Sequence, residues 1–201
     1  MKVKKILFIL IFIISINIPV KSCTLWGSAG STSKDGITLV TKNRDWKPDN
    51  RNELWLIKPE KGFKFIVLYA IGGESEGIKG GINEKGLVVL TASASTVPKE
   101  EKYGEKISIA ELLKTCDTVD AVLDKKDKFG KPFFYIIGDK TKIAIVEIGQ
   151  EGTSSVRKTE NGILYHTNHY LDENLIKFNK KENESSYVRY NRIKELLENH
   201  K

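Results

Sequence analysis

Four short segments of the chain carry side chains that could perform nucleophilic chemistry. They are Cys23-Thr24, Asn43-Arg44-Asp45-Trp46, His166-Thr167-Asn168-His169 and Ser185-Ser186-Tyr187-Val188-Arg189. A thiol can attack a carbonyl carbon, a carboxylate can orient a base, and an amide can stabilise a developing oxyanion. Each segment alone is a weak signal, because polar residues after a strand usually form a turn. Their meaning depends on the segments that surround them.

The segment before Cys23 predicts that this residue begins the mature chain. Residues 1–5 are positively charged, and Ile6–Val20 is largely apolar. An apolar stretch of this length is shorter than the roughly 20 residues of a membrane span. It is typical of a secretory signal peptide over residues 1–22, with cleavage after Ser22. We therefore predict a protein that is secreted, periplasmic or at the cell surface, with no membrane span after signal removal.

Three interpretations of Cys23 fit this position. It could merely lie near the cleavage site. It could be the acylated cysteine of a lipid-anchored, non-catalytic surface protein, although Lys21 stands where such proteins have a small residue. It could also be an N-terminal nucleophile, whose own α-amine accepts the thiol proton. An α-amine has a pKa near 8, so this mechanism requires no separate histidine.

Composition and charge describe one ordinary globular domain over residues 23–201. The chain is 40% hydrophobic and 29% charged, which excludes disordered and low-complexity classes. The excess of basic over acidic residues falls from 7 to 3 when the four lysines of residues 1–22 are set aside. We therefore expect no nucleic-acid partner, since the remaining basic residues form no clustered stripe.

The order of predicted elements is typical of an α+β fold with helices layered on largely antiparallel sheets. Alternating or continuous apolar runs predict strands at Thr24–Ala29, Ile37–Thr41, Glu53–Lys58, Phe63–Ala70, Leu87–Ala92, Phe133–Gly138, Lys142–Ile148 and Gly162–His166. Helical spacing predicts helices at Ser108–Leu113, Val119–Leu123 and Ser186–Glu198, the second capped by Asp117 or Thr118.

The remaining motifs predict no cofactor. The glycine-rich segment Gly72–Gly81 reads as a loop that fits neither dinucleotide-binding nor P-loop spacing. His166 and His169 lack a second ligand pair in register, so no metal site is predicted. Cys116 lies in the apolar register of a helix and is interpreted as a buried free thiol.

In this order, behind a cysteine released by cleavage, the four segments resemble the N-terminal-nucleophile (Ntn) hydrolases of the linear-amide type. These include choloylglycine hydrolases, penicillin V acylases and acyl-coenzyme A:6-aminopenicillanic acid acyltransferases. The acyltransferase branch looks closest, because of Tyr165-His-Thr-Asn-His169 and the helix over Arg189–Leu197. The resemblance runs from Cys23 to about Leu197. It implies an αββα sandwich and cleavage of a linear carbon–nitrogen amide through a thioester, or acyl transfer to an amine.

The resemblance assigns roles residue by residue. Cys23 matches the nucleophile, Asp45 the aspartate that would hold the α-amine, and Asn168 the asparagine that stabilises the oxyanion. Arg189 matches an arginine that would have an electrostatic or structural role near the nucleophile. A second oxyanion donor is expected near the strand end at Thr91–Ser93.

Trp46, beside the motif aspartate, is the best candidate for the substrate pocket, together with Thr91 and Ser93. The implied partner is a small-molecule amide, without metal or organic cofactor.

The sequence also departs from the related enzymes. Lys42 stands where choloylglycine hydrolases have an arginine, and Ser93 or a neighbour stands where they have an asparagine. Relatives usually continue beyond the Arg189 helix with strands that complete the sheets. A natural short form, strands supplied by a partner, and a truncated sequence remain as alternatives. An incomplete sheet would favour pairing of two copies.

Overall fold

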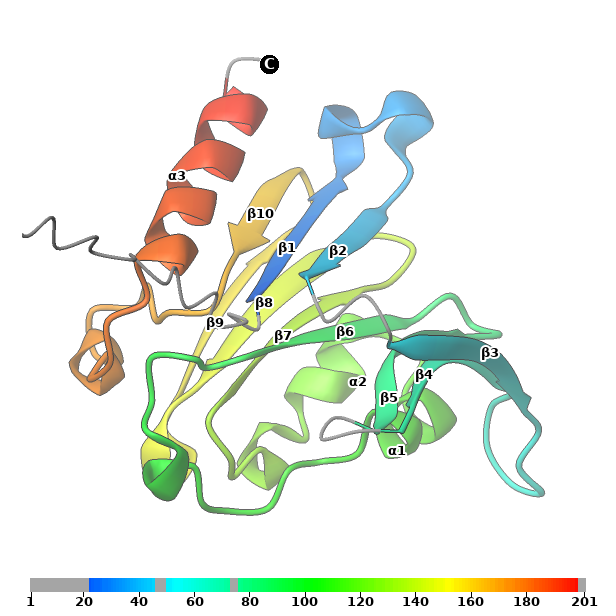
Figure 1. Cartoon of the computed structure of the whole chain (residues 1–201). Helices are drawn as coiled ribbons and strands as arrows, with labels where there is room; N and C mark the ends of the chain where they lie inside the picture. The colour runs from blue at the N-terminus through cyan, green and yellow to red at the C-terminus, as the bar shows by residue number, and fades with distance from the viewer. Residues whose placement is uncertain (1–21, 46–49, 73–75, 199–201) are drawn as a thin grey trace, which may run out of the picture.

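The computed structural model describes residues 22–45, 50–72 and 76–198 (Figure 1). Its larger sheet has seven antiparallel strands in the order of the chain, so that each strand pairs with the next. These strands are β3 (Arg51–Ile57), β4 (Phe65–Ile71), β5 (Gly77–Asn83), β6 (Val88–Ser93), β7 (Phe133–Gly138), β8 (Ile143–Ile148) and β9 (Ser154–Thr159). Consecutive strands are joined by short connections except β6 and β7, whose connection over residues 94–132 carries two of the helices.

A smaller antiparallel sheet brings together segments that lie far apart in the sequence. It has the order β10-β1-β2, with β1 (Ser22–Ala29) between β2 (Leu39–Asp45) and β10 (Gly162–His166). Leu25 pairs with His166 on one side and with Lys42 on the other. This register brings the end of β2 and the residues that follow β10 close to the beginning of β1.

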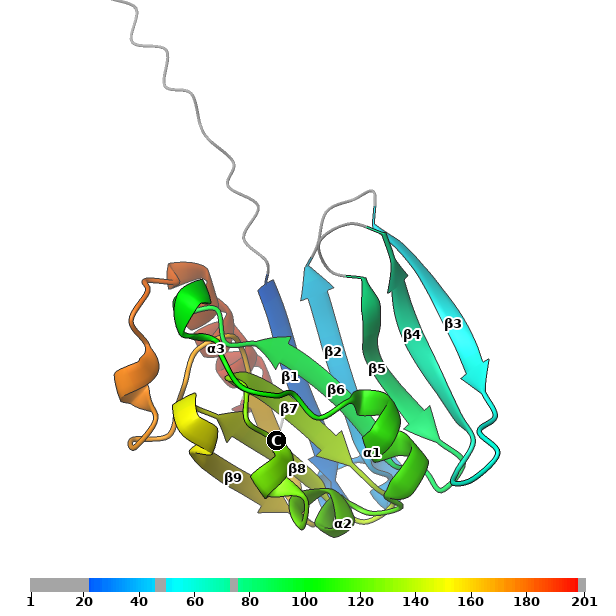
Figure 2. The same ribbon diagram turned by 90° about the horizontal axis from the view of Figure 1, so that it is seen from below.

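Within the described part of the chain, three α-helices complete a four-layer sandwich. The helices are α1 (Ile109–Thr115), α2 (Val119–Leu123) and α3 (Glu184–Glu198). Short 3₁₀ turns lie at Gly30–Thr32, Lys34–Gly36, Lys99–Glu101, Lys126–Lys128, Gln150–Gly152 and Ile176–Phe178. Helices α1 and α2 lie over the larger sheet (Figure 2), whereas α3 contacts β1 and β10 of the smaller sheet. The predicted α+β class and αββα layering are therefore confirmed.

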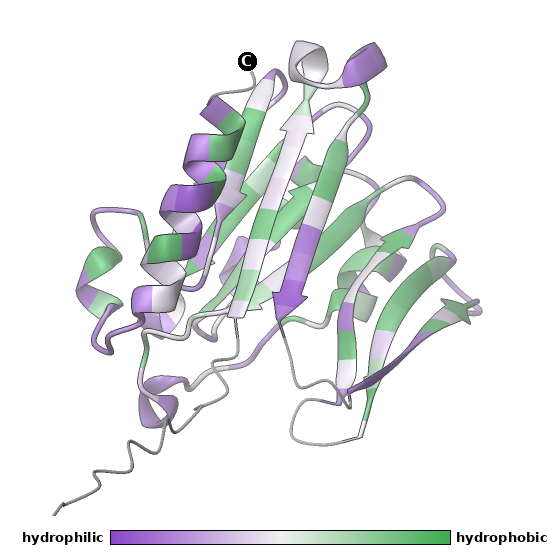
Figure 3. Cartoon of the chain, turned by 45° about the horizontal axis from the view of Figure 1, so that its top comes forward, coloured by the Kyte–Doolittle hydropathy of each residue, from purple (hydrophilic) through white to green (hydrophobic). Residues whose placement is uncertain are grey.

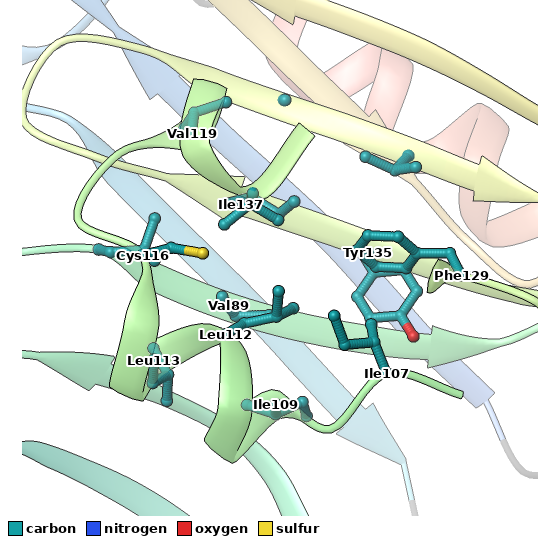
Figure 4. Packing of buried hydrophobic residues seen from close by; sticks show 14 of the residues in the cluster. Val89, Ile107, Ile109, Leu112, Leu113, Cys116, Val119, Phe129, Tyr135 and Ile137 are labelled. Carbon is teal, nitrogen blue, oxygen red and sulfur yellow. The ribbon is translucent and has the colours of Figure 1, made fainter. Parts of the chain in front are cut away.

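Two apolar cores hold these layers together. One lies between the larger sheet and α1–α2 and includes Tyr135, Ile137 and Cys116 (Figure 4). The other lies between the two sheets and includes Phe134, Ile136 and Leu25. Neighbouring residues of β7 therefore face opposite cores, which explains why this strand is a continuous apolar run rather than an alternating one.

Several local predictions are confirmed. The Thr118 side chain accepts a hydrogen bond from the backbone N–H of Ala121 at the start of α2. The strands predicted at Phe133–Gly138 and Lys142–Ile148 are β7 and β8, which pair as a hairpin with its turn at residues 139–142. Cys116 is a free thiol with 1% of its surface exposed.

Other local predictions are wrong. The segment Gly72–Gly81 is not a loop throughout, since β5 begins at Gly77. A Cβ atom on Gly81 would lie 2.5 Å from the carbonyl oxygen of Ile66, so close strand packing accounts for this glycine. β9 was not predicted, because this edge strand has exposed and half-buried residues only.

Helix α3 is less apolar on its packed side than its spacing predicts. Val188 and Leu196, expected on the apolar side, are 60% and 39% exposed. Ser186 is the buried residue of this helix. Figure 3 shows mostly hydrophilic residues along α3. Polar contacts therefore contribute much of what holds α3 against β1 and β10. Within the described residues, no helix is both long and apolar enough to span a bilayer.

A buried amide ties the end of α1 to the β5–β6 turn. Asn83 is 5% exposed, and its side chain makes four hydrogen bonds, to the carbonyl oxygens of Leu113 and Cys116 and from the N–H groups of Lys85 and Leu87. We expect Asn83→Ala to lower the free energy of unfolding by about 3 kcal/mol, because it leaves buried donors and acceptors without partners. Urea titration of the protein measures this value. The exposed helical Asn191→Ala is the control, and an equal effect of both variants would contradict the expectation.

Candidate active site

Cys23 lies at the beginning of β1, beside the last residues of β2 and close to the end of β10. Its side chain packs against the core between the two sheets, on the same face as the fully buried Leu25. Cys23 itself is half-buried. The thiol therefore stands at the end of the inter-sheet core, where it is partly protected from water and still accessible.

The side-chain amide of Asn168 is the central contact of Cys23. Its Oδ1 accepts a hydrogen bond from the backbone N–H of Cys23 at 2.7 Å and another from Nη2 of Arg189 at 3.0 Å. Its Nδ2 donates to the carbonyl oxygen of Ser93 at 2.8 Å. Nδ2 also lies 3.5 Å from Oγ of Ser93, a longer contact, and it is the donor that the predicted oxyanion role requires.

Buried groups of the loop after β10 and of α3 fix Asn168 in this orientation. Asn168 and Ser186 are both fully buried, and the Asn168 N–H donates to Ser186 Oγ at 2.8 Å. Ser186 Oγ also lies 2.8 Å from Nδ1 of His169. Burial and the nearby His166 and Arg189 lower the pKa of His169 to about 4, so this ring is neutral at neutral pH. Ser186 and His169 both lie in the motif segments, but the sequence did not indicate that they position Asn168.

Arg189 reaches from α3 to the backbone of β1. Its Nη1 donates to the carbonyl oxygen of Cys23 and lies 3.2 Å from Oγ1 of Thr24. Burial lowers the pKa of this guanidinium, and the proximity of Cys23 and Asp45 opposes that change. Arg189 therefore fixes the nucleophile segment and places a positive charge beside it.

Asp45 ends β2 directly opposite the residue that precedes Cys23. Ser22 and Asp45 are paired in register, and Ser22 Oγ donates to Oδ2 of the carboxylate at 2.9 Å. The carboxylate is close enough for its charge to raise the pKa of the Cys23 thiol. The structure thus brings Asp45, Asn168 and Arg189 around Cys23.

Burial and charge act in opposite directions on the Cys23 thiol. Burial is the largest effect and raises its pKa, because a thiolate loses water there. Lys42, Arg189 and Arg44 oppose this change, in that order. Burial in turn lowers the pKa of Lys42, whose Nζ donates to the carbonyl oxygen of Lys79 at 3.4 Å. Lys42 is therefore one of the cations of this site. The resemblance had marked its position only as a lysine where choloylglycine hydrolases have an arginine.

The three residues predicted to bind substrate have different outcomes. Ser93 lies at the site, through its carbonyl contact with Asn168. Thr91 is buried within β6, where strand alternation places it with Val89 toward α1 and α2, away from Cys23. Trp46 lies outside the described residues.

His166 belongs to the core rather than to the reacting groups. Its Nε2 lies 3.2 Å from Oε1 of Glu147, and both side chains are almost completely buried. Its ring packs on Phe134, with 4.3 Å between the ring centres. Among the described residues, no group of three or more His, Cys, Asp or Glu side chains is arranged to hold a metal ion.

A cavity of about 370 Å³ opens between β2 and the part of the larger sheet formed by β3–β6. Most of its wall is apolar, with Leu54, Ile66, Leu68, Ile82 and Leu90 among the lining residues. Lys42 and Arg44, two of the cations that act on Cys23, also line it. The cavity is therefore suited to an apolar group, and it shares these two cations with the Cys23 site, although Cys23 itself does not line it.

The sequence profile of the acyl-coenzyme A:6-aminopenicillanic acid acyl-transferase family matches residues 31–201. The chain belongs to this family. The match includes Asp45, Asn168 and Arg189 and begins after Cys23. The predicted resemblance is confirmed, and the predicted class of hydrolase or acyltransferase acting on amide bonds agrees with the family. No curated protein matches the sequence.

A solved structure of a conjugated bile acid hydrolase from Clostridium perfringens shares the fold. A cysteine-to-alanine mutant has a TM-score of 0.52 and 14% sequence identity, covering 76% of this chain and 54% of that chain. An arginine-to-leucine variant has a TM-score of 0.39 and 11% identity, covering 77% and 47%. The chain spans about half the length of these hydrolases. The first comparison supports the predicted Ntn-hydrolase sandwich.

The cations near Cys23 generate a prediction about thiol reactivity. We expect Lys42→Met to raise the thiol pKa, because it removes the positive charge that favours the thiolate most strongly. At pH 7–8 less thiolate would be present, and iodoacetamide would alkylate Cys23 several-fold more slowly. Peptide mass spectrometry over a pH series measures these rates, with the buried Cys116 as an internal reference. The control is Lys64→Met, on the exposed β3–β4 connection. Faster or unchanged alkylation of Lys42→Met would contradict this account.

Proposed function

We propose that this protein is an exported amidase or acyltransferase that cleaves a linear carbon–nitrogen amide bond through a thioester on Cys23. Removal of residues 1–22 as a signal peptide would make Cys23 the N-terminal residue. Its substrate would be a small-molecule amide, and its location secreted, periplasmic or at the cell surface. The observation that carries the proposal is the hydrogen bond from the Cys23 nitrogen to Asn168 Oδ1.

That nitrogen is the atom that cleavage after Ser22 would convert into an α-amine. Asn168 already binds it at 2.7 Å, and so would hold the amine beside the thiol of the same residue. Ser22 would leave with the signal peptide, and the Asp45 carboxylate would lose its hydroxyl partner. The carboxylate could then interact with the new amine across the β1–β2 pair. An α-amine with a pKa near 8 has a neutral fraction that can accept the thiol proton.

The reaction then follows from these groups. The amine takes the thiol proton, and the sulfur attacks the substrate carbonyl carbon to form a tetrahedral oxyanion. The carbon–nitrogen bond breaks as the ammonium returns its proton to the departing amine, leaving a thioester on Cys23. Water attacks the thioester in hydrolysis, or an acceptor amine does so in acyl transfer. Either attack releases the acyl group and restores the thiol.

The second N–H of Asn168 and the surrounding cations would stabilise the oxyanion. Donors fixed in place before the reaction need no reorganisation when charge develops. Asn168 meets this condition, since its side chain and backbone are held by Ser93, Ser186 and Arg189. Lys42 would add positive charge on the cavity side of the thiol.

The processing step is tested by the mass of the protein released from its native export route. Intact mass and N-terminal sequencing should give a chain that begins with unmodified Cys23. A chain that keeps residues 1–22, or a diacylglycerol-modified Cys23, would contradict the N-terminal nucleophile. The second result would instead indicate a lipid-anchored protein.

Activity is tested with a panel of acyl p-nitroanilides of increasing chain length. We expect Cys23→Ala to lose measurable turnover, and Asn168→Ala to lower kcat by roughly 10²–10³-fold through loss of an oxyanion donor. Cys116→Ala is the matched control and should retain turnover, because this thiol lies in the helix-side core. Thermal melting identifies any variant that fails to fold. Turnover by folded Cys23→Ala would exclude the proposed mechanism.

A further inference from the structure

Glu147 is a buried carboxylate that the proposed reaction does not use. It lies on β8, with 2% of its surface exposed. A buried charge is stable only when other groups pair with it or donate hydrogen bonds to it. β8 contacts β10 of the smaller sheet, and the residues that follow β10 include Asn168. The partners of Glu147 therefore bear on the candidate active site.

Among the described residues, these partners all belong to residues 166–172, which we call the β10 loop. Oε1 of Glu147 lies 3.2 Å from Nε2 of His166. Oε2 accepts hydrogen bonds from the backbone N–H groups of Leu171 at 2.9 Å and Asp172 at 3.4 Å. One side chain of the larger sheet thus contacts the β10 loop on both sides of its asparagine.

His166 extends this contact to the peptide group that precedes the Asn168 side chain. Its Nδ1 lies 2.9 Å from the carbonyl oxygen of Thr167, which can only accept, so the ring nitrogen donates. The same peptide group contains the N–H of Asn168, which donates to Ser186 Oγ at 2.8 Å. Both polar atoms of this planar peptide are therefore held, and its orientation sets the direction in which the Asn168 side chain leaves the backbone.

The carboxylate of Glu147 is ionised, because its donors compensate for its burial. Burial raises the pKa of the carboxyl, but the His166 ring and the N–H groups of Leu171 and Asp172 outweigh it and hold the pKa below its ordinary value. The His166 contact is electrostatic, since Nε2 is not aligned for a hydrogen bond. A buried pair of this kind adds little net stability over apolar residues of the same volume. Stability alone therefore does not account for a charge at this position.

We propose that Glu147 is a positioning residue, which acts through the β10 loop to orient the Asn168 amide toward Cys23. This inference rests on the proposed function, because it takes that amide as the oxyanion donor. Asn168 Oδ1 lies 2.7 Å from the Cys23 nitrogen, so a small rotation of the preceding peptide would move the amide away from the developing charge. Glu147 does not line the apolar cavity, and its polar contacts are to the β10 loop rather than to Cys23. Its loss should therefore lower kcat more than it changes KM.

Steady-state kinetics with the acyl p-nitroanilides test this role. Glu147→Leu removes the acceptors and keeps an apolar side chain, and we expect it to lower kcat roughly 10–10²-fold with KM close to the wild-type value. Glu147→Gln should restore most of kcat, because its amide oxygen can accept from Leu171 while its NH2 group donates to a neutral His166 ring. Glu147→Asp keeps the charge but is one methylene too short, so it should behave like Glu147→Leu. It replaces Glu147→Leu in the test if leucine prevents folding.

Asn83→Ala is the matched control for lost stability. Asn83 is also a buried polar residue with several hydrogen bonds, but it ties α1 to the β5–β6 turn. Its variant should keep the wild-type kcat at a temperature where thermal melting shows both variants folded. A folded Glu147→Leu variant with wild-type kcat would overturn the positioning role. So would a Glu147→Gln variant that loses as much as Glu147→Leu, or an equal loss in Asn83→Ala.

The NMR signal of the Asn168 side chain separates failure of this role from failure of the proposed function. In protein isotope-labelled at asparagine, the side-chain NH2 signals of Asn168 are those that Asn168→Ala removes. We expect Glu147→Leu to shift these signals and Asn83→Ala to leave them in place. Shifted signals in a protein whose wild type has no turnover would keep the positioning of Asn168 and reject the amidase mechanism. Turnover by the wild type, with kcat and the Asn168 signals unchanged in Glu147→Leu, would keep the mechanism and reject the positioning role.

Discussion

The buried amide of Asn168 connects the two sheets and α3 at a single point. Its oxygen accepts from β1 and from Arg189 of α3, and its nitrogen donates to the end of β6. A polar side chain in this position must be hydrogen-bonded, since an unpaired buried amide would destabilise the fold. Helix α3 depends on the same cluster, because Ser186 is its buried residue and several of its apolar side chains are exposed. The groups that would carry out the reaction are therefore also the groups that fix the layers.

The regular elements were predictable where a local pattern coincided with the tertiary environment. β7 lies between two cores, and its continuous apolar run therefore indicated a strand buried on both faces. The Thr118 cap and the β7–β8 hairpin with its turn at residues 139–142 depend on residues close to one another in the sequence. β9 has no such signal, since its pattern is that of a polar edge, and the glycines of β5 reflect packing against another strand.

The site was predictable as a set of segments but not as a geometry. The spacing of Asp45 after Cys23 follows from a strand pair, and register confirms that β2 returns beside β1. The layer that a strand side chain faces was not predictable, because alternation separates residues into two faces without saying which layer covers each face. Thr91 shares its face with Val89 of the helix-side core. Ser93 instead contacts Asn168 through its backbone carbonyl, whose direction does not depend on the face of the side chain.

The cations around Cys23 have opposite consequences for the two groups of an N-terminal nucleophile. With residue 22 attached, they act on the thiol alone, and they partly offset the effect of burial on its pKa. Cleavage after Ser22 would add an α-amine among Lys42, Arg44 and Arg189. The same positive charges would then disfavour its ammonium form and increase the neutral fraction that acts as base. Asp45 opposes that effect, because a nearby carboxylate favours the ammonium. One carboxylate and three cations would thus act on both groups at once: the cations limit the rise that burial causes in the thiol pKa, and together with Asp45 they leave the amine able to accept and return a proton.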